Sequence, residues 1–556
     1  MLDWPRRTER QALATSAATL EVQTGPEQIA QADPCGRDAL GRERGFALLL
    51  VSALTLFAAA IDGYHPYAED GGLYLAGVKR LLNPALYPQG TAFVLEPMRH
   101  SLFAPTVAGV VRWSHLPLPA VLLGLYLASI WATLFAAWML TSRCWTKRSA
   151  RAGAVVLLAC WLSIPVAGTA LLFMDPYATA RSFSTPAMVL SLAGALEMTA
   201  SSPDRKIFMQ RGFLLWAVSI ALATAMHPLM AAYALGATLM LLAALWPNRI
   251  LGRCGTAALS LSALALAACL RAIAKPEPAD YIRVAMTRTY WFPAQWRWYE
   301  LAGLAAPLGI LTIFAWGNWI LPTRIHSMQT NAGRALARMA IALGATSWLV
   351  AAWFARAADA THLVARMQPL RAFQIVYLVL VLLLGAKLGE SLLRRSAGRW
   401  AATMLLLGGI MFAAQRSAFP HSNHLELPGT VAQNQWVRAF LWIRDNTPVD
   451  ALFALDADYI NAPGEDAQCF RAIAERSALA DYSKDGGEAS IAPELTEDWT
   501  RSQAAQQHLS APSTTDAARL SALRTLGVSW VVLEPDTTTR FDCPYSNSAV
   551  KVCTLR

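Results

Sequence analysis

The sequence predicts an α-helical polytopic membrane protein with about eleven transmembrane helices and a small C-terminal α/β domain. First, 55% of the residues are hydrophobic and 15% are charged, whereas soluble domains carry about 25% charged residues. Second, apolar runs long enough to cross a bilayer follow one another through most of the chain. Third, the chain becomes polar from Arg416 onward. This composition excludes a soluble enzyme.

Residues 1–44 are polar and rich in arginine, which predicts a disordered cytoplasmic arm. Residues 45–415 form the predicted transmembrane domain, and 416–556 form the predicted soluble domain. The long loop 62–116 separates the first two spans. The predicted spans are 45–61, 117–140, 152–174, 184–200, 212–226, 229–246, 255–271, 299–320, 338–355, 372–388 and 400–415.

The net charge of +10 does not indicate a nucleic-acid partner, because basic residues gather in short loops between apolar runs. Such loops favour the cytoplasmic side. With the N-terminus in the cytoplasm, the clusters at 143–151 and 387–399 lie inside. An odd number of spans then places the C-terminal domain outside, and we expect a bacterial inner-membrane protein with a periplasmic domain.

The tail combines helical and strand patterns, which suggests a small α/β domain. Residues 434–446 space Trp436, Phe440 and Ile443 along one helical face, and 515–525 predict a second helix. Residues 450–455 and 527–533 read as strands. Cys543 and Cys553 both lie outside in this topology, so they form either a disulfide or two free thiols.

The first outside loop carries the main candidates for catalysis. Asp62, His65, Glu69 and Asp70 follow directly after the first span. Adjacent carboxylates beside a histidine can supply a general base, and Asp62, Glu69 and Asp70 can also ligate a divalent cation such as Mg²⁺ or Mn²⁺. Residues 73–82 place apolar side chains at helical spacing, which predicts an amphipathic helix on the bilayer. The alternative is an ordinary solvated loop.

Further polar groups lie in loops on the same predicted side of the membrane. Ionisable groups at the membrane are costly and therefore indicate function. Arginine presents a planar fork of donors that suits a phosphate, although interfacial snorkelling is the alternative. The candidate substrate-binding residues are Glu96, His100, Asp175, Tyr177, Arg181, His227, Arg366, Gln368 and Arg371.

This arrangement resembles the GT-C class of membrane glycosyltransferases. It looks most like a group of uncharacterised bacterial multi-span proteins with similar motifs. The motifs are HPYAEDGG at 65–72, DPYATARSFSTP at 175–186, MHP at 226–228 and RMQPLRAF at 366–373, with 445–448, 470–471, 475–477 and 481–484 in the tail. The resemblance implies many spans, a catalytic acid in the first outside loop and a polyprenyl-phosphate or polyprenyl-diphosphate sugar donor.

We therefore expect a glycosyltransferase that takes a sugar from a polyprenyl-phosphate donor to a glycan, lipid or protein acceptor at the bilayer. Asp70 or Glu69 is the expected base, with Asp62 and His65 orienting it or holding a metal. Arg366 and Arg371 are expected to hold the donor phosphate. A transporter or flippase is the alternative, but almost no polar residues lie within the spans. The second alternative is a non-catalytic envelope assembly protein.

Overall fold

The computed structural model of the protein describes residues 34–200, 210–320 and 331–555. The chain divides into two compact units, Met1–Leu49 and Leu50–Arg556. Helix α1, Pro34–Asp62, begins in the first unit and ends in the second. Most of the predicted arm 1–44 lies outside the described residues, and its part from Pro34 onward is helical. All structure described below belongs to the second unit.

A helix stands at each of the eleven predicted spans. Seven helical stretches among the described residues are long and apolar enough to cross a membrane, and α8 and α9 are shorter. The chain is therefore a multi-pass membrane protein, while the number eleven stays a prediction. The helices after α1 are α5 Leu118–Cys144, α6 Arg148–Cys160, α7 Ala180–Ala200, α8 Arg211–Met226, α9 Pro228–Ala244, α10 Arg249–Ile273, α12 Trp298–Ile320, α13 Asn331–Phe354, α15 Phe373–Leu388 and α16 Ala397–Ala418.

The third predicted span, 152–174, is wrong in its second half. Helix α6 ends at Cys160, and an irregular segment closed by a bridge between Pro165 and Leu172 leads to α7. Proline has no backbone N–H and clashes with the preceding helical turn, so a helix cannot run through Pro165 undisturbed. The apolar composition of this segment reflects burial inside the protein, where Leu171 and Phe173 are almost inaccessible.

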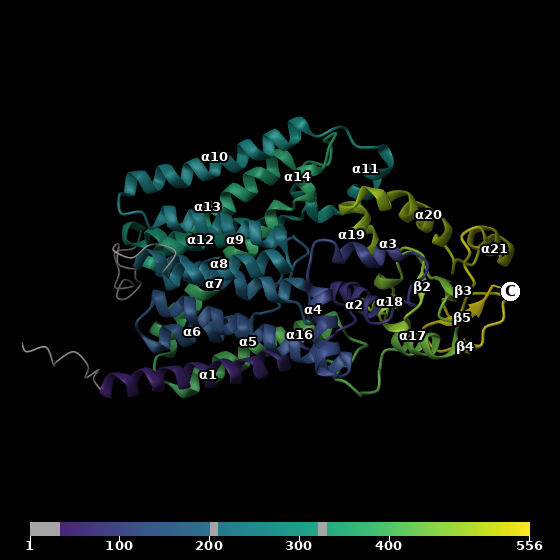
Figure 1. Cartoon of the computed structure of the whole chain (residues 1–556), viewed down its shortest axis with the longest axis horizontal. Coiled ribbons are helices and arrows are strands. Elements are labelled where there is room, and N and C mark those ends of the chain that lie inside the picture. The colour runs from purple at the N-terminus through teal and green to yellow at the C-terminus, as the bar shows by residue number, and fades with distance from the viewer. Residues whose placement is uncertain (1–33, 201–209, 321–330, 556) are drawn as a thin grey trace, which may run out of the picture. The chain divides into compact units, whose positions relative to one another are not determined.

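The membrane helices pack in one connected set. Helix α7 lies against α5, α8 and α9, and α13 lies against α9, α10 and α12. Helix α6 packs on α15, and this contact is close because glycines face each other. A Cβ atom added at Gly153 would lie 2.3 Å from the carbonyl oxygen of Gly385. Figure 1 shows these long helices side by side and the sheet beyond one end of them.

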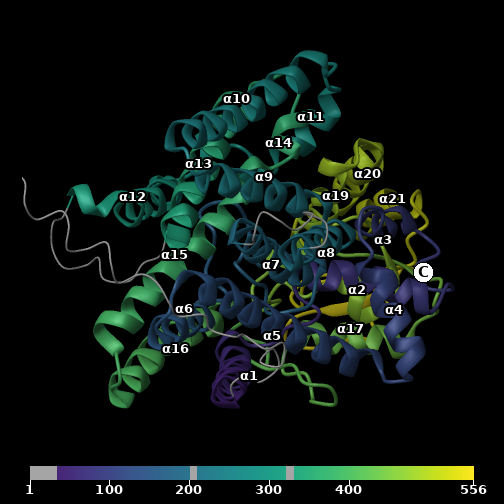
Figure 2. The same cartoon turned by 60° about the vertical axis from the view of Figure 1, so that its left-hand side comes forward.

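The first long loop is folded. It contains α2 Glu69–Leu82, α3 Thr91–Leu95, the 3₁₀ turn Glu96–Met98 and α4 Phe103–Ser114. Helix α2 is amphipathic as predicted, but it packs on α4 and on α18, Phe470–Ala474, and its Leu75, Ala76 and Val78 are buried. It therefore covers protein, and the prediction of a helix lying on the bilayer is wrong. Both views place α2 among the C-terminal helices (Figures 1 and 2).

Two further loops carry short helices near the same end of the bundle. Helix α11, Ala279–Met286, follows α10, and the turns Thr289–Trp291 and Pro293–Gln295 lead into α12. Between α13 and α15 lie α14, Leu363–Arg366, and the 3₁₀ turn Pro369–Ala372. Pro369 fits the first position of that turn, because its missing N–H has no partner to lose there.

The C-terminal region forms the predicted α/β fold. Its mixed five-stranded sheet has the order β2-β1-β3-β5-β4, with β1 parallel to β2 and β3. Trp436, Phe440 and Ile443 of α17 are buried as expected, and Cys543 and Cys553 form a disulfide. The strands are β1 Leu452–Ala454, β2 Ser477–Ala478, β3 Trp530–Leu533, β4 Tyr545–Ser546 and β5 Lys551–Thr554. The helices are α17 Gln435–Asn446, α19 Lys484–Ile491, α20 Thr496–Gln506 and α21 Asp516–Arg524.

Candidate functional site

A cavity of about 1560 Å³ lies where the folded first loop, the ends of several membrane helices and α19 meet. Its walls come from segments more than 400 residues apart in the chain, so only the tertiary fold creates it. Eleven of the thirteen residues that the sequence singles out line it: Glu69, Asp70, Glu96, His100, Asp175, Tyr177, Arg181, His227, Arg366, Gln368 and Arg371. Asp62 and His65 do not.

Asp70 lies at the start of α2 between two cations. Its Oδ1 accepts a hydrogen bond from Nζ of Lys484 at 3.0 Å, and its Oδ2 lies 3.0 Å from Nη2 of Arg181. Burial by itself would raise the pKa of Asp70, but the charges of Lys484 and Arg181 outweigh it and hold that pKa well below the usual range. Asp70 is therefore a carboxylate at neutral pH.

Close packing around Asp70 explains the two glycines that follow it. A Cβ atom at Gly71 would lie 2.8 Å from the ring of Tyr177, and one at Gly72 would lie 2.3 Å from the carbonyl oxygen of Tyr67. Only glycine permits this approach. The motif 69–72 therefore brings the carboxylates at the start of α2 directly against the segment 175–181.

Arg181 connects two carboxylates. Its Nη2 donates to Oδ2 of Asp175 at 2.9 Å and also lies beside Asp70, while its Nε finds no hydrogen-bond partner among the described residues. Burial raises the pKa of Asp175, and the charge of Arg181 acts in the opposite direction. Arg181 thus shares its charge between two anions and keeps one donor free.

Arg371 lines the cavity, and no described residue forms an ion pair with it. No ion pair or side-chain hydrogen bond of Arg371 exists among the described residues, and its Nε is buried and unpaired. Arg366 differs, because its Nη2 lies 3.1 Å from Oε1 of Glu277 and its guanidinium stacks over the ring of Tyr281. Gln368 adopts a left-handed backbone with φ of 49° and keeps its Oε1 unpaired.

His227 separates α8 from α9 and is neutral. Burial lowers its pKa to about 3, and the charges of Arg371 and Arg181 act in the same direction. Its Nδ1 has no hydrogen-bond partner in the described part of the chain. Pro228 at the first position of α9 fixes this sharp break between two helices. A neutral imidazole beside two arginines can donate or accept a hydrogen bond without adding charge.

Asp62 and His65 lie behind the cavity rather than in it. Oδ1 of Asp62 accepts a hydrogen bond from the hydroxyl of Ser163. His65 is fully buried, stacks on Phe419 with the ring centroids 4.0 Å apart, and its Nδ1 lies 3.1 Å from Oε1 of Glu426.

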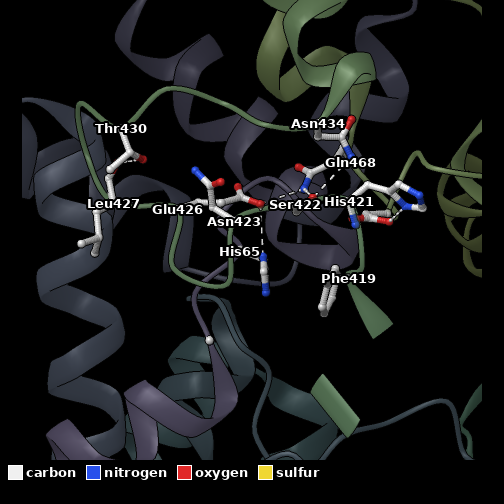
Figure 3. A network of polar contacts seen from close by, with 12 residues as sticks. His65, Phe419, His421, Ser422, Asn423, Glu426, Leu427, Thr430, Asn434 and Gln468 are labelled. Carbon is white, nitrogen blue, oxygen red and sulfur yellow. Dashed lines mark hydrogen bonds and ion pairs between the residues drawn. The ribbon is translucent and has the colours of Figure 1, made fainter. Parts of the chain in front are cut away.

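The contact between His65 and Glu426 belongs to a polar network along the linker from α16 to α17 (Figure 3). Gln468 donates to the same Oε1 of Glu426 at 3.0 Å and to the hydroxyl of Ser422 at 3.3 Å. Asn434 also donates to Ser422. This network ties the first loop to the linker, so His65 fixes the wall that Phe419 contributes to the cavity.

The expected metal site does not assemble from its predicted members. Asp62 lies outside the cavity, and Glu69 and Asp70 both contact Lys484. In the described parts of the chain, no group of three or more His, Cys, Asp or Glu side chains is arranged to hold a metal ion.

Two cavity residues of α19 were not singled out as site residues. Lys484 contacts Asp70 and Glu69, and Glu488 lies one helical turn further along. The stretch 484–488 (KDGGE) places opposite charges four residues apart, which in most helices is only a surface ion pair. No local pattern shows that this helix faces the first loop.

The solved structures to which the chain is similar include two of oligosaccharyltransferases and one of an arabinofuranosyltransferase. It matches the archaeal oligosaccharyltransferase AglB of Archaeoglobus fulgidus, in complex with an inhibitory peptide and a dolichol-phosphate, at 12% identity and a TM-score of 0.41, over 89% of this chain and 70% of that one. An A. fulgidus oligosaccharyltransferase with zinc and sulfate matches at 13% identity and 0.40, over 88% and 68%.

The third is the mycobacterial arabinofuranosyltransferase AftD, at 16% identity and a TM-score of 0.47. That match covers 92% of this chain but 41% of AftD. All three structures are of glycosyltransferases, the class that the sequence motifs resemble. No family model and no curated protein sequence matches the chain.

Proposed function

We propose that the protein is a membrane glycosyltransferase that uses a lipid-phosphate-linked sugar as its donor. The observation that carries the proposal is that one cavity holds both an uncompensated arginine and an ionised carboxylate. Arg371 offers a positive charge with no anionic partner among the described residues, and Asp70 offers a carboxylate that stays ionised. An anionic leaving group and a hydroxyl nucleophile need these two groups.

The donor phosphate is proposed to bind between Arg371 and Arg181. Both arginines line the cavity, and both have an unpaired Nε. A guanidinium binds phosphate oxygens through a planar fork of donors. Arg366 is the weaker candidate, since Glu277 already compensates its charge. The sequence predicts Arg366 and Arg371 as the phosphate-binding pair. We propose Arg181 and Arg371 instead.

Apolar side chains line part of the cavity and can contact the lipid chain of the donor. Leu229 and Ala232 of α9 and Met411 and Ala414 of α16 line the same space as the arginines. These two helices also carry exposed apolar side chains such as Leu235 and Leu406, and Met367 both lines the cavity and is exposed. A phosphate at the arginines can therefore keep its hydrocarbon tail in lipid.

The chemical step is a displacement at the anomeric carbon of the donor sugar. The acceptor hydroxyl oxygen forms the new bond to that carbon while its proton passes to Asp70. The bond from the carbon to the phosphate oxygen breaks, and its electron pair leaves with the lipid phosphate. Arg371 and Arg181 stabilise the charge that develops on this leaving group.

Donor binding also explains how a carboxylate with a low pKa can take a proton. A phosphate that binds Arg181 competes with Asp70 for the guanidinium. Losing part of that contact, and gaining a negative neighbour, raises the pKa of Asp70. The base then becomes stronger only when the donor is in place. His227 is neutral and lies within the influence of both arginines, so it can hydrogen-bond the phosphate without repelling it.

The predicted topology places this reaction at the outer face of a bacterial inner membrane. The disulfide between Cys543 and Cys553 supports an oxidising compartment for the C-terminal domain. A donor at that face has to be carried by a lipid, because nucleotide sugars stay in the cytoplasm. Arginines supply the positive charge in this scheme.

Binding of undecaprenyl phosphate to the full chain in lipid nanodiscs tests the phosphate site. We expect Arg371→Gln to weaken binding about tenfold or more, because charge-assisted hydrogen bonds contribute about 1.5–3 kcal/mol each. Arg356→Gln is the matched control, since that side chain is 54% exposed and pairs with Asp359. Equal affinity of Arg371→Gln and the wild-type protein would remove the basis of the proposal.

The role of Asp70 needs a separate variant. Asp70→Asn should still bind undecaprenyl phosphate and insert into the membrane, but we expect transfer to fall by about 100-fold or more, the usual contribution of a general base. The double change with Glu69→Gln tests whether the neighbouring carboxylate substitutes for it. Transfer by the double variant at the wild-type rate would contradict the assignment.

A further inference from the structure

Glu488 lines the cavity from the C-terminal domain and has no side-chain partner among the residues that the structure describes. It lies in α19, one turn after Lys484, and lines the same cavity as Asp70. Among the described residues its carboxyl group makes no hydrogen bond and no ion pair. An unpaired polar group at a cavity wall is available to a ligand.

The surroundings of Glu488 favour a neutral carboxyl group. Burial raises its pKa well above the ordinary value, and the negative charges of Asp70, Glu96 and Asp485 raise it further, while Lys484 acts the other way. A protonated carboxyl group both donates and accepts hydrogen bonds. Such a group matches a hydroxyl, which also does both.

The backbone next to Glu488 leaves room for a ligand. Gly487 lines the cavity, and a Cβ atom added there would meet nothing closer than Nη1 of Arg288 at 4.0 Å. Gly486 is different, because its added Cβ would lie 2.9 Å from Arg288 and from Trp499. Gly486 is therefore needed for packing, whereas Gly487 opens onto empty space.

The positive charges on this side of the cavity are already occupied. Lys484 pairs with Asp70 and Glu69. Arg288 donates to the carbonyl oxygens of Ser483 and Tyr482, and its guanidinium lies over the ring of Tyr482. Glu69 and Glu96 add negative charge to the lining. Within the described chain, an anionic ligand would find no free cation here, unlike at Arg371.

The shape of the lining argues against an extended peptide. A peptide usually adds a strand to an exposed sheet edge. In the described chain, the cavity is lined on this side by α19 and by loops, and none of β1 to β5 contributes. Tyr482 and Tyr290 also line the cavity, and Tyr482 is 38% exposed. Aromatic rings and hydrogen-bonding carboxyl groups suit the apolar faces and hydroxyls of a sugar.

We propose that Glu488 and the open space at Gly487 form the acceptor subsite, and that the acceptor is a neutral carbohydrate. This inference rests on the proposed glycosyltransferase function, which supplies the reason for an acceptor. Lys484 and Glu488 lie on the same helix one turn apart. A sugar hydroxyl held by Glu488 therefore lies beside Asp70, which Lys484 holds.

Binding of the labelled full-length protein in nanodiscs to an array of neutral, carboxylated and phosphorylated oligosaccharides tests this subsite. We expect the wild-type protein to prefer neutral oligosaccharides. Glu488→Ala removes the hydrogen-bonding group, and Gly487→Leu fills the space, so each should lower the signal about tenfold or more. Asp498→Ala is the control, since this side chain of α20 is 63% exposed and outside the cavity.

Undecaprenyl phosphate binding by the same variants separates a lost subsite from a misfolded protein. Both α19 variants should keep wild-type affinity for the lipid phosphate. The inference is overturned if neither variant lowers oligosaccharide binding, if the wild-type protein binds no neutral oligosaccharide, or if it prefers the carboxylated or phosphorylated oligosaccharides. A wild-type protein that binds neutral oligosaccharides but does not bind undecaprenyl phosphate would instead refute the proposed donor site.

Discussion

Nζ of Lys484 lies 3.0 Å from Oδ1 of Asp70, although 414 residues separate them in the chain. Lys484 also contacts Glu69, and Arg181 holds the other oxygen of Asp70. The carboxylate at the start of α2 is thus joined to a membrane helix on one side and to the C-terminal domain on the other. Its ionisation depends on both parts of the protein.

Removing Lys484 should destabilise the protein and raise the pKa of Asp70. Lys484→Met removes the cation that Glu69 and Asp70 share, while Arg181 still contacts Asp70. Because the carboxylates are partly exposed, we expect a loss of about 1–3 kcal/mol in unfolding free energy, between the values for exposed and buried pairs. Thermal unfolding in nanodiscs measures it. Lys484→Arg keeps the charge and should restore most of the stability.

A half-exposed lysine gives the matched comparison. Lys147 is 44% exposed and pairs with Glu390, so Lys147→Met should cost about 1 kcal/mol or less. The pH dependence gives a second test. In the wild-type protein the lowered pKa of Asp70 contributes stability at pH values above the ordinary pKa of an aspartate, near 4. This contribution is lost as the pH falls toward the folded-state pKa. In Lys484→Met the folded-state pKa of Asp70 lies closer to that ordinary value, so this loss should be smaller and should be complete at a higher pH.

The sequence predicts that the distant motifs lie on one side of the membrane, but not which side chains contact each other. Asp70, Arg181, His227 and Arg371 all follow or precede apolar runs on one predicted side of the membrane. They share the cavity in the structure. Sequence alone did not distinguish the partners, so the compensation of Arg366 by Glu277 and the free state of Arg371 among the described residues had to come from the fold.

Other features were outside the reach of a local pattern. Nothing in the sequence around Lys484 and Glu488 shows that α19 packs against α2, since that contact joins two regions with hundreds of residues between them. His65 was grouped with the catalytic acids because it stands near them in sequence, whereas its side chain contacts Glu426 and Phe419 and does not line the cavity. The early end of α6 was signalled by Pro165, but the apolar run beyond it hid the signal.

The pair of His362 and Glu277 should make stability depend on pH. Nδ1 of His362 lies 2.8 Å from Oε2 of Glu277, and this hydrogen bond raises the pKa of His362 although burial opposes it. A raised pKa adds stability that is complete below the ordinary value near 6.5 and is lost as pH rises through the folded-state pKa. The wild-type protein should therefore melt at a higher temperature at pH 6 than at pH 8.5.

His362→Asn should reduce this difference between pH 6 and pH 8.5 in thermal unfolding. His508→Asn is the control, because His508 is exposed and its left-handed backbone suits asparagine. A melting difference that is the same in His362→Asn and the wild-type protein would show that another group governs the pH dependence.

The disulfide between Cys543 and Cys553 should stabilise the C-terminal domain. It closes a loop with a sequence separation of 10 around the turn that leads into β5. Loop-closure entropy for such a loop corresponds to about 2–3 kcal/mol. We expect the Cys543→Ser, Cys553→Ser double variant to lose that much unfolding free energy and to unfold at a lower temperature. Adding reductant should lower the melting temperature of the wild-type protein only. A wild-type melting temperature unchanged by reductant under unfolding conditions would argue against the bond.

The contact of α6 with α15 should tolerate no side chain at its glycines. Gly153→Ala would place a Cβ atom 2.3 Å from the carbonyl oxygen of Gly385, so backbone has to move, at a cost of about 1–3 kcal/mol or more. Gly124→Ala in α5 meets nothing within 4 Å and should be neutral. Because α15 begins two residues after Arg371, a displaced α15 also moves the proposed phosphate site. Gly153→Ala should therefore lower both the melting temperature and the affinity for undecaprenyl phosphate, whereas Gly124→Ala should change neither.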